Sequence, residues 1–156
     1  MDRDVACMHR AIRLAREAQR LGNLPVGAVI TRDGDVVAEG RNSIRVPNLS
    51  PSRHAEMEAL QAVPPGLWAS EGEITLYTTL EPCPMCLGAI LAHPINRVVF
   101  GSSDDRAGAS CLLGHLPSAY ERRRQTLEWI GPALPDECNK LNELVATLLV
   151  ERRNGI

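Results

Sequence analysis

Aromatic residues are scarce in this 156-residue chain: one phenylalanine, two tyrosines and two tryptophans, 3% in total. An excess of positive charge is also lacking, because 17 Lys+Arg against 19 Asp+Glu leave a formal net charge of −2. Proteins that mainly grip nucleic acid use stacking aromatics and a basic surface, so both shortages count against that role. No apolar run approaches the roughly 20 residues that span a bilayer, so we expect no membrane association.

The five cysteines do not suit a disulfide framework, because their number is odd and the chain shows no export signal. Residues 1–4 carry mixed charge and lead directly into a helical pattern, so we expect a cytoplasmic protein without a signal peptide. The close pair Cys83 and Cys86 suggests metal binding or redox chemistry. We expect the others to be small buried apolar groups: Cys7, Cys111 and Cys138.

Periodicity predicts strands and helices in alternation, which is typical of a layered α/β domain built on one sheet. An Asp33-Gly34 turn between the first two strands predicts a tight hairpin, so the sheet should be mixed. No repeat or linker interrupts the pattern, and we expect residues 1–156 to form a single domain. The expected helices are 4–21, 55–63, 84–92, 118–124 and 135–153, and the expected strands are 25–32, 36–42, 74–80, 97–100 and 125–130.

Two helix faces stand out in this pattern. Arg13, Arg16 and Arg20 share a polar face of the first helix, which we interpret as solvated rather than as a contact for nucleic acid. The last helix carries an apolar stripe that should face the core, formed by Leu141, Leu144, Val145, Leu148 and Leu149.

Two short motifs carry the chemistry, His54-Ala55-Glu56 and Pro82-Cys83-Pro84-Met85-Cys86. Each motif stands where a helix should begin, and free N–H groups there favour the thiolate that binds metal. His54, Cys83 and Cys86 could therefore hold one zinc ion with its fourth position open to water. Glu56 is close enough in sequence to exchange protons with that water without ligating the metal.

Two other hypotheses use the same residues. A thiol–disulfide oxidoreductase would explain the Cys83–Cys86 pair but would leave the histidine motif without a role. A non-catalytic zinc module would need a fourth ligand to close the site, and Cys111 or His115 could supply it.

His-x-Glu followed by Pro-Cys-x-x-Cys is the signature of the zinc deaminases. The sequence resembles the cytidine deaminase-like superfamily, in the branch of the tRNA adenosine deaminases and the small guanine and cytosine deaminases. The likeness runs along nearly the whole chain and is carried by residues 25–29 (PVGAV), 39–42 (EGRN), 54–56 (HAE), 79–86 (TLEPCPMC) and 99–101 (VFG).

The resemblance implies a three-layer α/β/α fold with a five-stranded mixed sheet and one Zn²⁺ per subunit at two adjacent helix starts. It also implies a homodimer or a higher oligomer. It implies a hydrolytic deaminase in which Glu56 carries protons to the ring nitrogen and to the departing amine. Substrate contacts carried over in the same way are Asn42 as a hydrogen-bond partner, Val26 and Ala55 in the base pocket, and an acidic residue from a later loop, Asp104 or Asp105.

Members of this family act on different substrates. Segments 25–27, 105–109 and 136–138 resemble the tRNA adenosine deaminases, which convert adenosine to inosine in the anticodon loop. The slightly acidic chain with few aromatics, and the segment 83–90, instead favour the guanine-deaminase type. We therefore expect a free nucleobase or nucleoside as the substrate, with tRNA as the alternative.

Overall fold

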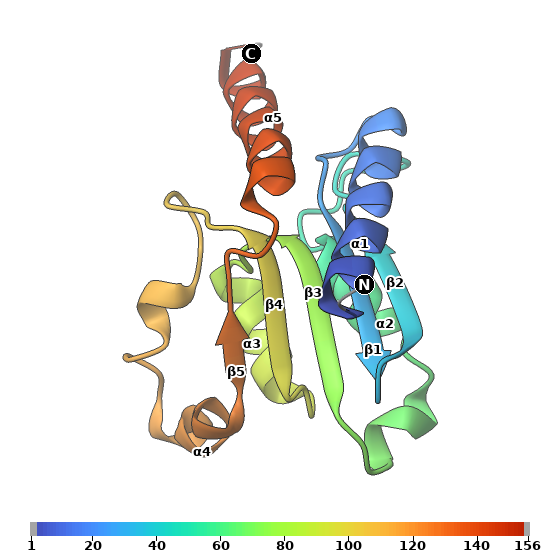
Figure 1. Cartoon of the computed structure of the whole chain (residues 1–156). Helices are drawn as coiled ribbons and strands as arrows, with labels where there is room; N and C mark the ends of the chain where they lie inside the picture. Colours follow the sequence, from blue (N-terminus) through green and yellow to red (C-terminus); the bar gives the residue numbers. More distant parts are fainter. Residues whose placement is uncertain (1–2, 155–156) are drawn as a thin grey trace.

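One mixed sheet organises the molecule, and its five strands lie in the order β2-β1-β3-β4-β5 (Figure 1). A computed structural model describes residues 3–154, so the first two residues of segment 1–4 lie outside it. β1 pairs antiparallel with β2 and β3, whereas β3, β4 and β5 run parallel. The strands are β1 (Gly27–Arg32), β2 (Asp35–Arg41), β3 (Ile74–Leu80), β4 (Arg97–Ser102) and β5 (Glu128–Ile130).

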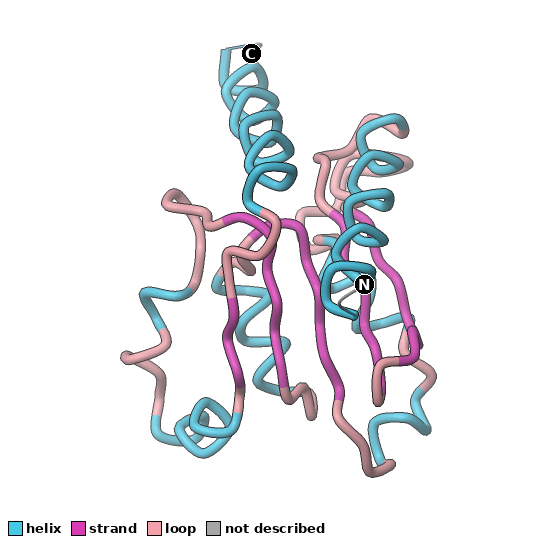
Figure 2. Tube along the Cα trace, viewed as in Figure 1, coloured by secondary structure: helices cyan, strands magenta, loops and turns pink. Residues whose placement is uncertain are grey.

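Helices cover both faces of the sheet, which confirms the predicted α/β/α fold. Figures 1 and 2 show α1 and α5 on the near side and α2 and α3 behind the strands. None of the described helices is both long and apolar enough to span a membrane. The helices are α1 (Arg3–Arg20), α2 (Ala55–Ala62), α3 (Pro84–Ala92), α4 (Ser118–Thr126) and α5 (Pro135–Asn154), with short 3₁₀ turns at Pro65–Ala69 and Ser110–Leu112.

The alternation of side chains along the strands fills two separate cores. Leu76 and Val98 face α2 and α3 in one cluster, whereas their neighbours Tyr77 and Val99 face α1 and α5 in the other. Because both faces of the sheet are covered, the central strands are buried almost throughout, including the threonines of β3. The predicted hairpin is confirmed: Asp33 and Gly34 both adopt positive φ, at 50° and 87°.

The first turn of α2 lies unusually close to the sheet because residue 40 of β2 is a glycine. A Cβ on Gly40 would lie 2.2 Å from the carbonyl oxygen of Ala55 and 2.4 Å from the amide nitrogen of Ala59. Any larger residue would push the helix outward. This approach fixes the start of α2, and with it His54 and Glu56, against the sheet.

Three expectations from the sequence need correction. Cys7 and Cys138 are buried, but Cys111 is exposed in the loop after β4, so it is not a core residue. In α5, Leu144 and Leu149 are 39% and 43% exposed, because this half of the helix projects beyond the strand ends (Figure 1). The fifth strand is shorter than expected, because residues 125 and 126 belong to α4 and β5 begins only at Glu128.

A partly buried ion pair holds the start of α1 against the sheet. Asp4 accepts hydrogen bonds from both terminal nitrogens of Arg97, at 3.2 and 2.9 Å, and from the Tyr77 hydroxyl at 2.6 Å. The Arg97 hydrogen bond outweighs the opposing effect of burial and holds the pKa of Asp4 below its ordinary value of 3.8.

Replacing this carboxylate should cost stability only where it is ionised. The unfolded chain binds the proton more tightly than the folded chain does, so the contribution of Asp4 is complete above about pH 4 and fades as the pH falls further. We expect Asp4→Asn to lower the free energy of unfolding at pH 7 by about 1 kcal/mol, and by much less near pH 2.5. Urea unfolding at both pH values measures this, with the exposed Asp35→Asn as the matched control. An equal loss at both pH values would contradict the assignment.

Candidate metal centre and active site

Two helix starts meet beside the end of β3. His54 is the residue that precedes α2, with φ −70° and ψ 155°, and Cys83 precedes α3, with φ −76° and ψ 171°. Neither side chain caps its own helix with a hydrogen bond, so both are free to point elsewhere. Cys86, one turn into α3, is fully buried behind them.

The three side chains converge on one point. Nδ1 of His54 lies 3.6 Å from Sγ of Cys83 and 3.6 Å from Sγ of Cys86. All three donor atoms lie within 4.8 Å of one another. Tetrahedral zinc with ordinary Zn–N and Zn–S bonds requires nitrogen–sulfur separations of about 3.5 Å, so the donor set fits this ion.

The cluster has three members. Among the described residues neither Cys111 nor His115 belongs to it, so neither closes the site as a fourth ligand. A zinc site with three protein ligands keeps one position for water or substrate, which is typical of a catalytic rather than a structural centre.

The electrostatics of the cluster favour a thiolate at Cys83. Hydrogen bonds from Cys86 and then from His54 lower the pKa of Cys83 to about 4, despite opposing burial. The same contact with Cys83, together with burial, raises the pKa of Cys86, and the bond to Cys83 raises the pKa of His54. A negative charge is therefore stabilised between the two helix starts, where a cation can bind.

Glu56 stands beside the metal ligands without belonging to their cluster. Its carboxylate is 3% exposed; Oε1 accepts a hydrogen bond from the Thr78 hydroxyl at 3.1 Å, and Oε2 lies 3.6 Å from Sγ of Cys86. Burial has the largest influence on the pKa of Glu56, and it raises this pKa. A carboxyl group whose pKa is raised in this way holds a proton more readily than an exposed one, which suits it to general acid–base chemistry.

A cavity of about 190 Å³ opens above these groups. Among the residues predicted to bind substrate, Val26, Asn42 and Asp104 line it, whereas Ala55 is fully buried in the core and does not. Asn42 Oδ1 accepts a hydrogen bond from the Ile44 amide at 3.2 Å, while Nδ2 makes none to the described residues. That donor is free for a ligand. The remaining lining residues are Leu24, Ile44, His54, Glu56, Leu80, Glu81, Cys83, Ala107, Val145 and Leu149.

Glu81 is one residue that the motifs did not single out as functional. Its buried carboxylate accepts hydrogen bonds from the amide of Asp104 at 2.9 Å and from that of Ser110 at 2.8 Å. It thus binds the loop after β4 to the strand that leads into Cys83. Its place directly before Pro82 in the cysteine motif is the signal that could have identified it.

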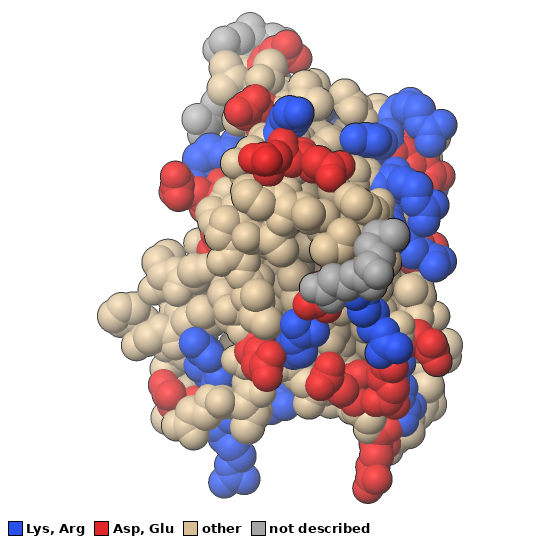
Figure 3. Space-filling model, in the orientation of Figure 1, with Lys and Arg blue, Asp and Glu red and all other residues tan. Residues whose placement is uncertain are grey.

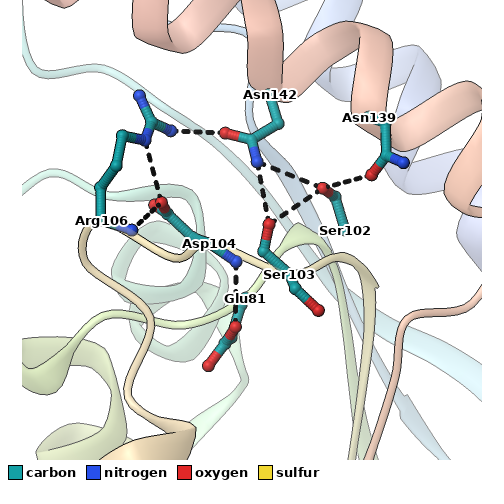
Figure 4. A network of polar contacts seen from close by, with 7 residues as sticks. All are labelled: Glu81, Ser102, Ser103, Asp104, Arg106, Asn139 and Asn142. Atoms are coloured by element: carbon teal, nitrogen blue, oxygen red, sulfur yellow. Dashed lines mark hydrogen bonds and ion pairs between the residues drawn. The ribbon is translucent and has the colours of Figure 1, made fainter.

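The same loop is tied to α5 by the polar network of Figure 4. Arg106 donates to Asp104 Oδ1 from its backbone amide and from Nε, at 3.1 and 3.0 Å, and its guanidinium also reaches Asn142. Asn142 in turn donates to the Ser103 carbonyl at 2.9 Å. The network holds the α5 wall of the cavity, which includes Val145, over the site. No sequence pattern pointed to Thr78 or to this wall, because both become part of the site only through packing.

A buried carboxylate beside a three-ligand zinc site is an arrangement typical of a hydrolase. Residues 1–102 match the model of the cytidine and deoxycytidylate deaminase zinc-binding region, so the chain belongs to this deaminase family. It is a zinc-dependent hydrolase of C–N bonds, which confirms the predicted activity and excludes the oxidoreductase hypothesis.

Relatives of two kinds are similar to this chain. The tRNA-specific adenosine deaminase of Bacillus subtilis is 39% identical over 142 residues, covering 88% of this chain and 85% of that protein. A structure from a study of A-to-I editing by tRNA:A34 deaminases has a TM-score of 0.65 and 32% identity, covering 73% of this chain and 90% of that one. The structure of a guanine deaminase from Bacillus subtilis has a TM-score of 0.56 and 39% identity, covering 63% of each chain.

Zinc content should depend on the converging cysteines and not on the exposed one. We expect Cys86→Ser to lose most of its zinc, because a neutral hydroxyl replaces a thiol donor, whereas Cys111→Ser should keep one ion per chain. Metal analysis of both purified proteins measures this. Equal zinc loss in the two variants would contradict the ligand set.

Proposed function

We propose that this chain hydrolyses the exocyclic amine of an adenosine in a tRNA anticodon loop, producing inosine. The main support is the likeness to tRNA-specific adenosine deaminases, which extends over nearly the full length of both chains. The guanine deaminase of Bacillus subtilis is matched over only 63% of this chain. The guanine deaminase of Nitrosomonas europaea covers 90% of it, but at only 23% identity. This proposal departs from the free nucleobase that we expected from composition and favours the alternative.

The size of the cavity agrees with a base that enters alone. Sites for drug-sized ligands enclose about 300–1,000 Å³, and this one encloses about 190 Å³. A nucleobase turned out of its strand would fill the space, and the attached ribose and phosphates would stay at the surface. In this pose Asn42, whose Nδ2 is free, and Asp104 line the space that the base would occupy.

His54, Cys83 and Cys86 would hold one zinc ion per chain in this proposal. Zinc, when bound, supplies the Lewis-acid activation that makes water a nucleophile near neutral pH, with a pKa of about 7. The site's own contribution is position: Glu56 is held by Thr78 within reach of both the attacking water and the base.

Glu56 then carries two protons in turn. It takes the first from the attacking water and gives it to the ring nitrogen next to the amino-bearing carbon. It takes the second from the added hydroxyl and delivers it to the amine, which leaves as ammonia when the C–N bond breaks. One water is consumed, one ammonia is released, and the carbon becomes a carbonyl. Burial suits Glu56 to both steps because it stabilises the protonated carboxyl.

Guanine deamination is the second candidate. The exposed Asp105 and the buried Asp104 both follow β4, and a carboxylate here could accept hydrogen bonds from the N–H groups of free guanine. A homodimer, implied by the family resemblance, remains a prediction for either substrate.

Removing only the proton-carrying ability of Glu56 should stop turnover and spare the metal. We expect Glu56→Gln to lower kcat by about 10²–10⁴-fold, since the amide preserves the shape and the Thr78 contact but cannot exchange protons. Ammonia release and zinc content, measured on the same sample, test this. Turnover near the wild-type rate at full zinc occupancy would overturn the role.

A substrate panel tests the proposed function itself. An anticodon stem-loop bearing adenosine should release ammonia readily, whereas free adenine, guanine, cytosine and their nucleosides should release little. The same stem-loop with guanosine at the target position is the matched control. Efficient deamination of free guanine, with no turnover of the stem-loop, would replace this proposal by the second candidate.

A further inference from the structure

A second groove lies on the outer face of α1, away from the zinc ligands. It is lined by α1 and by one residue of β2, and its charged members are four arginines and two glutamates. Figure 3 shows these basic side chains gathered along α1 at the right-hand edge of the molecule. The lining residues are Arg10, Arg13, Leu14, Arg16, Glu17, Arg20 and Glu39.

The positive charges in this groove are not balanced within it. Glu39 is paired with Arg10, and Glu17 is paired with Arg41 at 3.3 Å. Arg13, Arg16 and Arg20 are exposed and make no ion pair with the described residues. Three unpaired like charges within two helical turns repel one another, at a cost of a few tenths of a kcal/mol per pair. The surface therefore attracts anions, although the whole chain is slightly acidic.

The groove adjoins the active site at two points. On β2, Glu39 of the groove stands three residues before Asn42, which lines the base cavity. On α1, Arg20 is followed four residues later by Leu24, which lines the same cavity. Between them Asn23 accepts hydrogen bonds from the amides of Arg45 and Val46, at 2.8 and 3.0 Å, so the end of α1 is fixed to the rim of the cavity.

We propose that this α1 groove binds the phosphate backbone of the RNA whose base enters the cavity. The inference rests on the proposed function and extends it to a surface outside the family motifs. Guanidinium groups form forked hydrogen bonds with phosphate, and the helix spaces Arg13 and Arg20 about 10 Å apart along one line. A strand can therefore follow the helix with several phosphates while its base lies in the cavity. This interpretation replaces the solvated face that the sequence suggested.

The test compares two double variants that each remove two positive charges. The groove variant, Arg13→Gln with Arg20→Gln, removes two positive charges from the groove. The control variant, Arg122→Gln with Lys140→Gln, removes two exposed charges on α4 and α5. Each zinc-loaded protein is assayed for Kd, KM and kcat with the anticodon stem-loop over a series of salt concentrations. A third variant, Arg13→Lys with Arg20→Lys, keeps the positive charges. It shows whether a loss of affinity in the glutamine variant comes from the missing charge or from misfolding.

We expect the groove variant to raise Kd and KM about tenfold with kcat unchanged. The slope of log Kd against log salt should fall by about 1.4, the change expected when two phosphate contacts on single-stranded RNA are lost. The lysine variant should keep most of the affinity and the control should match wild type.

If the groove variant behaves like the control, the proposal is wrong. If wild type binds the stem-loop without deaminating it, the proposed function fails while the Kd comparison still decides the groove. If wild type binds no RNA, both fail.

Discussion

The convergence of two helix starts on the end of β3 is the constraint on which the site depends. It requires α2 to lie close enough to the sheet for His54 to meet the cysteines of α3, and Gly40 permits that approach by having no side chain. The short distances between Nδ1 and the two sulfurs follow from this packing. The unpaired amides of both helix starts also favour a buried negative charge, so the geometry and the electrostatics of the metal centre have one origin.

A second set of contacts extends from the same place to the substrate side. Glu81 precedes the cysteine motif and binds the loop after β4, and Arg106 connects that loop to α5. The metal centre, the loop after β4 and the α5 wall of the cavity are therefore joined by hydrogen bonds rather than by chain continuity. The zinc-binding residues and the α5 wall thus come from different segments, so a change in one does not require a change in the other.

Net charge alone says little about which partner this protein binds. A formal charge of −2 describes the whole chain, whereas binding depends on how charge is distributed. Folding pairs Glu17 and Glu39 with arginines and leaves other arginines of α1 exposed in one groove. The small number of aromatic residues is also compatible with our proposal, since a cavity that encloses one base needs no row of stacking side chains.

Much of this protein could be predicted from its sequence because the signals are local. The Asp33-Gly34 turn, the apolar strands and the two motifs each act within a few residues, and they determined the mixed sheet, the three zinc-binding side chains and the neighbouring glutamate. Tertiary structure alone decided the rest. Whether Thr78 reaches Glu56, whether Val145 covers the cavity and which arginines remain unpaired depend on contacts between segments 20 to 120 residues apart. Local periodicity contains no information about such contacts, because it repeats with the helix or the strand and not with the fold.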